Sequence, residues 1–266
     1  KKKVKHETLM VIGLADWQIG KPNTEKAVEA YFKSIYAILD DLKNLRKKYT
    51  IEKLVLCGMG DLLENCSNNF SPTGLFEQLY DNRTQMKIAR RMLVKTIKIL
   101  TPHFTDITVM CCMGNHGQKR QGKGNFETTY GDNLDAELFD NVSEIFQDAP
   151  AYKHIKWIIP ENDLTLSVQV LPDTVLTIHH GHSARHGQNA QAKVVKVYDT
   201  SVLMVGHFHH HFSVELDERL IIGCSAQDHS GQQYFVETGG GSAIPGTTAF
   251  LMHNKEGRKW SDINIY

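Results

Sequence analysis

Potential metal ligands follow five separate apolar runs of this sequence, at the point where each run stops. One strand ending in an aspartate is commonplace, but five such endings in one chain mark the residues that could do chemistry. The composition also indicates a metal site, because the chain has 14 histidines and many of them lie between residues 179 and 211. The five endings are Asp16-Trp17-Gln18, Gly60-Asp61, Gly114-Asn115-His116, His179-His180-Gly181-His182 and Gly206-His207-Phe208-His209.

These residue types suit the hydrolysis of a phosphate ester. The reaction needs positive charge beside the phosphoryl oxygens and a hydroxide at neutral pH, and two metal ions about 3.5 to 4 Å apart supply both. Two cations that close need a bridging anion, for which Asp61 is the candidate. Alternate residues of an extended segment point the same way, so we expect Asp16 and Gln18 to face one metal together. The same spacing places His207 with His209.

A sheet of parallel strands joined by helices would bring such endings together. In the first half of the chain, apolar runs of strand length alternate with helical periodicity, as in βαβ units. Ligands of open α/β sheets bind beyond the carboxyl ends of the strands, where these polar residues lie. We expect strands at 8–14, 53–57, 106–113, 163–170, 174–180, 201–206, 211–216, 219–223 and 247–252. We expect helices at 24–49, 81–100, 132–146 and 188–197.

The five endings resemble the ordered motifs of the calcineurin-like metallophosphoesterase superfamily, here DWQ, GD, GNH, HG and GHFH. The resemblance covers most of the chain, from residue 16 to residue 209. It implies an α/β four-layer α/β/β/α sandwich with the metal site at the carboxyl ends of the strands. It implies that His116 contacts the scissile phosphate and protonates the leaving group. It also implies a first metal held by Asp16, Gln18, Asp61 and His209, and a second held by Asp61, Asn115, His180 and His207.

Two positions depart from the superfamily's pattern. The third residue of the first motif is usually His and here is Gln18, and the third motif is usually followed by an acidic residue and here by Gly117. The amide oxygen of Gln18 can still serve as a ligand. An oxygen-rich first site favours Mn²⁺, with Mg²⁺, Fe²⁺, Ni²⁺ and Zn²⁺ as alternatives. A single-metal or inactive site is left open, and His182 is the alternative to His180.

Basic residues favour nucleic acid as the substrate. The helix expected at 81–100 carries six of them, and QKRQGK after the third motif places Lys119 and Arg120 where they could bind a phosphate backbone. Asn115 and His116 would complete the substrate contacts. The segments DWQIGK, GDLLEN, ARRML and GCSAQDHSGQQYF resemble phage-type and bacterial exonucleases related to the SbcD DNA-repair nuclease. The sequence therefore predicts a metal-dependent phosphodiesterase, namely a DNA exonuclease.

Two other functions stay open at this point. One is a phosphatase or phosphodiesterase acting on a small nucleotide or a phosphoprotein. The other is a metal-binding scaffold that keeps the fold for protein assembly, with Gln18 as the sign of lost catalysis.

The composition is that of a globular protein. The 266 residues are 41% hydrophobic, and no stretch approaches the roughly 20 apolar residues that a spanning helix needs. Thirty basic residues balance thirty acidic ones, so any nucleic-acid surface must be local. Five cysteines without a CxxC pair fit a reducing cytoplasm. We expect one metallophosphoesterase domain over 1–266. Because residue 1 is not Met, we expect that the chain was processed or excised from a longer one, and we leave open whether it dimerises.

Overall fold

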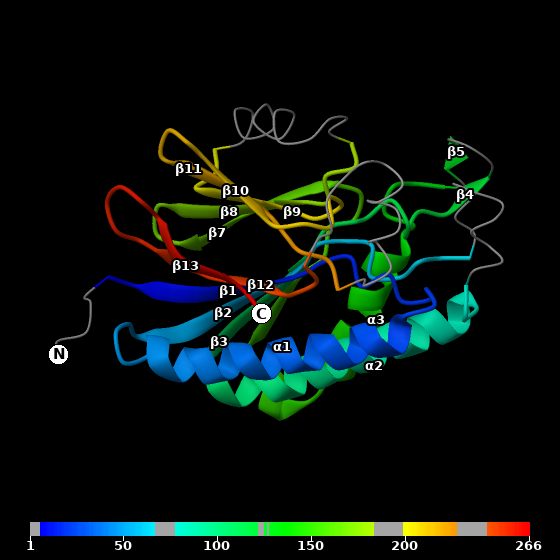
Figure 1. The fold of residues 1–266 in the computed structure, drawn as a ribbon, viewed down its shortest axis with the longest axis horizontal. Helices are drawn as coiled ribbons and strands as arrows, with labels where there is room; N and C mark the ends of the chain where they lie inside the picture. Colours follow the sequence, from blue (N-terminus) through cyan, green and yellow to red (C-terminus); the bar gives the residue numbers. More distant parts are fainter. Residues whose placement is uncertain (1–5, 67–77, 122–124, 127, 184–198, 228–243) are drawn as a thin grey trace.

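Two β-sheets stack face to face, and three long helices cover the outer face of the larger sheet (Figure 1). The computed structural model describes residues 6–66, 78–121, 125–126, 128–183, 199–227 and 244–266. The mixed α/β class and the pair of stacked sheets confirm the prediction from the sequence. The helix expected at 188–197 lies outside the described residues.

The larger sheet has six strands in the order β13-β12-β1-β2-β3-β6. Its four strands β1, β2, β3 and β6 run parallel, while β12 and β13 add an antiparallel edge. The strands are β1 Thr8–Leu14, β2 Ile51–Gly58, β3 Asp106–Cys111, β6 Ile155–Ile158, β12 Thr248–His253 and β13 Trp260–Ile265. Because β1, β2 and β3 are parallel neighbours, their carboxyl ends share one edge of the sheet.

The smaller sheet has five strands in the order β10-β11-β9-β8-β7. Strands β8, β9 and β11 are parallel, and each outer strand pairs with them antiparallel. The strands are β7 Thr165–Leu171, β8 Thr174–His179, β9 Val202–Val205, β10 Phe212–Leu216 and β11 Arg219–Gly223. A two-stranded piece, β4 Arg120–Gln121 with β5 Asn125–Phe126, stands apart from both sheets.

The long helices are α1 Thr24–Leu45, α2 Asn82–Leu100 and α3 Leu134–Gln147. Helix α2 begins after Asp81, whose carboxylate accepts a hydrogen bond from the backbone N–H of Thr84 at 2.7 Å. Helix α1 ends at Leu45, so the expected helix to residue 49 was too long. Short 3₁₀ turns at Thr101–His103 and Pro150–Tyr152 complete the helical residues of the described chain. No described helix is long and apolar enough to cross a membrane.

Alternation along β1 explains the layering. Met10, Ile12 and Leu14 pack into the core shared with the helices, whereas Leu9 and Val11 pack into the core between the two sheets. A strand buried on both faces reads as a continuous apolar run, which is what the sequence has. The edge strands β6 and β13 were not predicted, because a four-residue strand and a polar strand at the sheet edge lack such a run.

Candidate metal centre

The chain turns sharply where it leaves the strands that carry the motifs. Five residues after these strands have a positive φ although none is glycine, a conformation that costs free energy for such residues. They are Asp16 (φ 47°), Gln18 (φ 44°), Asp61 (φ 54°), His207 (φ 66°) and His209 (φ 59°). Because all five share this unfavourable backbone conformation, the surrounding structure must hold them in it and so fixes the directions of their side chains.

Glycine is required where the loops after β2 and β3 meet. A Cβ atom on Gly114 would lie 2.1 Å from the Asp61 Oδ1 atom, and one on Gly60 would lie 2.7 Å from the Gly114 backbone. Gly60 also has φ 86°, in the region that favours glycine. The GD and GNH motifs thus owe their glycines to the close approach of the two loops around Asp61.

Asp61 and His180 form the centre of the cluster. The Asp61 Oδ2 atom lies 2.9 Å from His180 Nε2, and this nitrogen lies 3.1 Å from the amide oxygen of Asn115. His180 Nδ1 lies 2.7 Å from the backbone oxygen of Met59, which orients the ring. One ligand atom from each of Asp61, His180 and His207 falls within 4.8 Å of the others. These three side chains are therefore placed to share one cation.

Asp16 and His209 lie beside this trio. The Asp16 Oδ1 atom is 3.4 Å from His209 Nε2, and Asp16 Oδ2 accepts a hydrogen bond from the backbone N–H of His207 at 3.1 Å. The backbone N–H of Asp16 also donates to the oxygen of Gly60 at 3.2 Å. These contacts join the loops after β1, β2 and β9 into one site.

Two carboxylate oxygens of the expected metal ligands lack a hydrogen bond of good geometry and have only imidazole nitrogens beside them. Asp16 Oδ1 and Asp61 Oδ2 are buried and have no hydrogen bond of good geometry to a described residue. A buried carboxylate oxygen is costly unless a cation or donor compensates it. Carboxylate, amide and imidazole groups also form a donor set that divalent metals accept. The residues present therefore fit the metal ions that the motifs imply.

Burial and neighbouring charges set the protonation states of the site residues. Burial and the neighbouring His180 lower the pKa of His207 to about 4, which keeps the ring in its neutral, metal-binding form. Burial also opposes protonation of His180, but the Asp61 carboxylate outweighs it and raises the pKa to about 9. Asp61 has its pKa lowered by the same pairing, since His180 and His116 outweigh the burial penalty. A cation bound here would compete with the His180 proton for Asp61.

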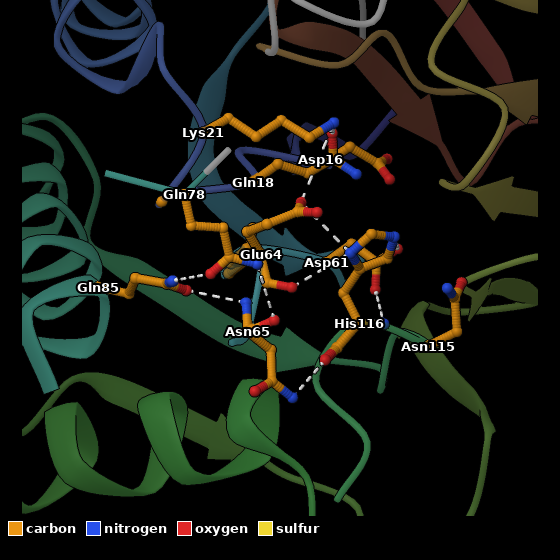
Figure 2. Close-up of polar contacts among 12 residues, drawn as sticks. Asp16, Gln18, Lys21, Asp61, Glu64, Asn65, Gln78, Gln85, Asn115 and His116 are labelled. Carbon is orange, nitrogen blue, oxygen red and sulfur yellow. Dashed lines mark hydrogen bonds and ion pairs between the residues drawn. The ribbon is translucent and has the colours of Figure 1, made fainter. Parts of the chain in front are cut away.

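His116 lies next to Asp61 with 19% of its side chain exposed (Figure 2). Its Nε2 atom is 3.8 Å from Asp61 Oδ2, and its Nδ1 atom is 3.3 Å from Glu64 Oε2. Its backbone N–H donates to Asp61 Oδ1 at 2.7 Å, and its backbone oxygen accepts from Asn65 Nδ2 at 2.8 Å. Burial would lower its pKa, but Asp61 and Glu64 raise it to about 9. His116 thus carries a proton at the rim of the cluster.

A family model of the calcineurin-like phosphoesterases matches residues 9–211, which include every motif described above. The chain belongs to the calcineurin-like phosphoesterases. Members of this family hydrolyse phosphoesters with divalent metals, in agreement with the cluster of Asp61, His180 and His207.

Solved structures of similar fold have low sequence identity to this phosphoesterase. An archaeal phosphodiesterase is 15% identical, with 98% of this chain and 100% of that chain covered and a TM-score of 0.43. The zinc complex of Vps29 from Entamoeba histolytica is 12% identical, with 97% of each chain covered and a TM-score of 0.37. A predicted phosphoesterase from Streptococcus pneumoniae is 10% identical, with coverages of 61% and 76% and a TM-score of 0.34. No curated protein gives a significant match.

One expected substrate contact of this phosphoesterase, Lys119, has acidic partners, and the two histidines considered as ligands differ in their contacts. The Lys119 ammonium lies 2.6 Å from Asp132 and 3.5 Å from Glu137, so its charge is already paired with acidic groups. His182 Nε2 lies 3.3 Å from the side-chain nitrogen of Gln118, whereas His180 contacts Asp61. The geometry therefore favours His180 over His182. The side chain of Arg120 lies outside the described residues.

Asp135 supports the site and was missed in the sequence. It is buried in the first turn of α3, and its carboxylate accepts hydrogen bonds from the backbone N–H groups of Asp61, Leu62 and Gly114, each at 3.0 Å. One side chain thus fixes the loops after β2 and β3. An acidic residue in a first helical turn is common for electrostatic reasons alone, so its sequence position could not reveal this role.

Proposed function

We propose that this phosphoesterase is a metal-dependent phosphodiesterase that cleaves DNA, acting as an exonuclease. The observation that carries the hydrolytic part is the pair of buried oxygens on Asp16 and Asp61 that lack a hydrogen bond of good geometry, with imidazoles beside them and the proton-bearing His116 at the rim. A phosphoester placed over these oxygens would have cations on one side and a proton donor on the other.

The ligand roles follow the motifs, with Asp61 shared. The proposed first ion is held by Asp16, Gln18, Asp61 and His209, and the second by Asp61, Asn115, His180 and His207. When bound, the two ions, for which Mn²⁺ is our first choice, neutralise phosphoryl charge and make a water molecule acidic enough to attack at neutral pH.

His116 supplies the proton in this proposal, and Glu64 orients its ring. His116 holds a proton near the position of the leaving oxygen, as a general acid must. Glu64, 3.3 Å from His116 Nδ1, orients the ring so that Nε2 faces Asp61. Asn65 fixes the backbone of the loop that carries His116, because its side chain donates a hydrogen bond to the His116 backbone oxygen.

DNA as the substrate is supported by the charge of α2. The helix contains six basic residues and no acidic one, and all six basic side chains are exposed. On α1, by contrast, Lys33 and Lys43 pair with Glu29 and Asp40 at 2.6 Å. Within the described chain, no ion pair joins a basic residue of α2 to an acidic one. The six are Arg83, Lys87, Arg90, Arg91, Lys95 and Lys98.

The first turn of α2 is linked to the candidate site. Gln85 Oε1 accepts a hydrogen bond from the backbone N–H of Asn65 at 2.8 Å, and Asn65 in turn holds the backbone oxygen of His116 (Figure 2). A strand with its scissile phosphate beside His116 could therefore continue along the basic face of α2. Phosphate contacts of this kind supply most of the sequence-independent affinity for DNA.

A substrate panel tests the proposal. With Mn²⁺, we expect turnover of bis-p-nitrophenyl phosphate and of labelled single-stranded or double-stranded DNA, with products released from an end. Preference for nucleotides or a phosphoprotein over DNA would instead establish the small-substrate alternative. Internal cleavage of circular DNA would overturn the exonuclease assignment.

Charge removal on α2 separates DNA binding from chemistry. The triple variant Arg83→Gln, Lys87→Gln and Arg90→Gln is expected to raise KM for DNA at least tenfold and to reduce the slope of log affinity against log salt by about 2. Turnover of bis-p-nitrophenyl phosphate should stay the same. The control carries Lys26→Gln, Lys33→Gln and Lys43→Gln on the exposed surface of α1. Equal effects of both triples on DNA would contradict a role for α2.

A scaffold function is the second candidate, because one observation favours it. The Gln18 amide oxygen accepts a hydrogen bond from Lys21 Nζ at 2.5 Å, so the atom expected to bind the first metal already has a partner. A scaffold with an impaired site would hold fewer than two ions and would fail to hydrolyse bis-p-nitrophenyl phosphate. Metal content measured together with that turnover separates the two candidates.

The state of the cysteines bears on the compartment of this protein. All five cysteines are free thiols, and four of them are buried. Free thiols fit the reducing cytoplasm that we propose for this protein.

A further inference from the structure

The Lys21 side chain reaches back from the end of the β1–α1 connection, just before α1, to the proposed position of the first metal. Its ammonium donates to the Gln18 amide oxygen at 2.5 Å, three residues earlier in the chain. The side chain is only 24% exposed. Gln18 itself is buried and has the positive φ of the other motif residues. Both members of this pair are therefore held in place by the fold.

The same ammonium approaches the proton-bearing part of the site. Lys21 Nζ lies 4.0 Å from Glu64 Oε2, and this oxygen lies 3.3 Å from His116 Nδ1 (Figure 2). His116 Nε2 is in turn 3.8 Å from Asp61 Oδ2. Charges of alternating sign thus run from Lys21 through Glu64 and His116 to Asp61. Glu64 helps to hold the Lys21 ammonium beside the cluster.

We infer that Lys21 is a built-in cation of the first metal position, which takes the Gln18 oxygen as its partner and weakens binding of the first ion. The inference rests on the proposed two-metal function and assigns the weak site to a particular side chain. The second position differs, because none of the contacts described for Asp61, His180 or His207 involves a lysine or an arginine. The second position is then the tight one.

Two physical effects act in the same direction. A divalent ion ligated by Gln18 would have to displace the ammonium from the amide oxygen and would then lie close to its positive charge. Like charges a few ångströms apart in a half-buried site repel strongly, because the effective dielectric constant is well below that of water. If the Gln18 oxygen stays hydrogen-bonded to Lys21, the first ion keeps only Asp16 and His209 as ligands of its own. Asp61 is shared with the second ion.

Metal binding without substrate measures this effect. Equilibrium dialysis against stepped free Mn²⁺, followed by elemental analysis, gives the number of ions bound and the midpoint for each. Lys21→Met removes the charge and keeps a side chain of similar length. We expect the midpoint of the weaker site to fall by about tenfold in this variant, while the tighter midpoint stays unchanged.

The controls separate local charge from general effects. Lys26→Met removes one charge from an exposed position on α1 and should leave both midpoints unchanged. Lys21→Arg keeps the charge and should keep the weak midpoint high. If Lys21→Met fails to fold, as judged by thermal unfolding, Lys21→Gln removes the same charge with a polar side chain.

Gln18→His tests the ligand rather than the cation. It should also lower the weaker midpoint, because imidazole binds borderline metals better than a neutral amide does. If this variant tightens the site while Lys21→Met leaves the midpoint unchanged, ligand type alone sets the affinity and our inference is wrong. If the original protein binds a single ion, a second ion gained in Lys21→Met supports the inference, and none gained overturns it. Absence of DNA cleavage with these metal results intact would reject the proposed nuclease function alone.

Discussion

Asp61→Asn is expected to lose most bound metal and nearly all phosphoesterase activity. Asp61 is the carboxylate shared by both proposed metal positions, and its Oδ2 atom is buried without a hydrogen bond of good geometry. An amide in its place offers no negative charge to hold two cations together. The fold should survive, because the amide oxygen can still accept the hydrogen bond that the His116 backbone donates to Oδ1.

Elemental analysis after dialysis is the direct measurement for this variant, with thermal unfolding to show that it is folded. The matched control is Asp81→Asn, since Asp81 is exposed and asparagine also caps helices well. The control should keep both metal and activity. Two ions still bound at full occupancy in Asp61→Asn would remove Asp61 from the bridging role.

His116→Ala is expected to keep its metal and to lose turnover of DNA by about 10²- to 10⁴-fold, as for a lost general acid. The ring contacts Asp61 from the side and is not among the proposed ligands, so metal content should be unchanged. A substrate with a good leaving group needs less protonation in the transition state. Turnover of p-nitrophenyl esters should therefore fall much less than turnover of DNA.

The two substrates measured side by side decide the role of His116. His103→Ala is the control, because His103 lies exposed on the 3₁₀ turn after α2 and only its backbone oxygen takes part in a described hydrogen bond. Equal losses on DNA and on the nitrophenyl ester would mean that His116 binds the phosphate without donating a proton. Loss of metal would instead make it a ligand.

The sequence by itself determined the strands that are buried on both faces and the residues at their ends, but not the edge strands β6 and β13. Strands buried on both faces, such as β1 and β2, appear as continuous apolar runs, and the polar residue that stops each run lies at the sheet edge. The order of the motifs predicted the family. It also placed Asp16, Asp61 and His180 in one site, which the structure brings together.

Only the tertiary structure decided which side chains compensate one another in that site. Asp135 lies 74 residues from Asp61 in sequence, yet its carboxylate accepts a hydrogen bond from the Asp61 backbone N–H. In the sequence alone, this aspartate cannot be told from an exposed aspartate at the start of a helix. Lys119 is near the third motif in the chain but pairs with Asp132. Lys21 donates a hydrogen bond to Gln18 because the backbone turns back after β1. Sequence spacing predicts which face or edge a residue occupies, whereas charge pairing depends on distances of a few ångströms that only the packed chain sets.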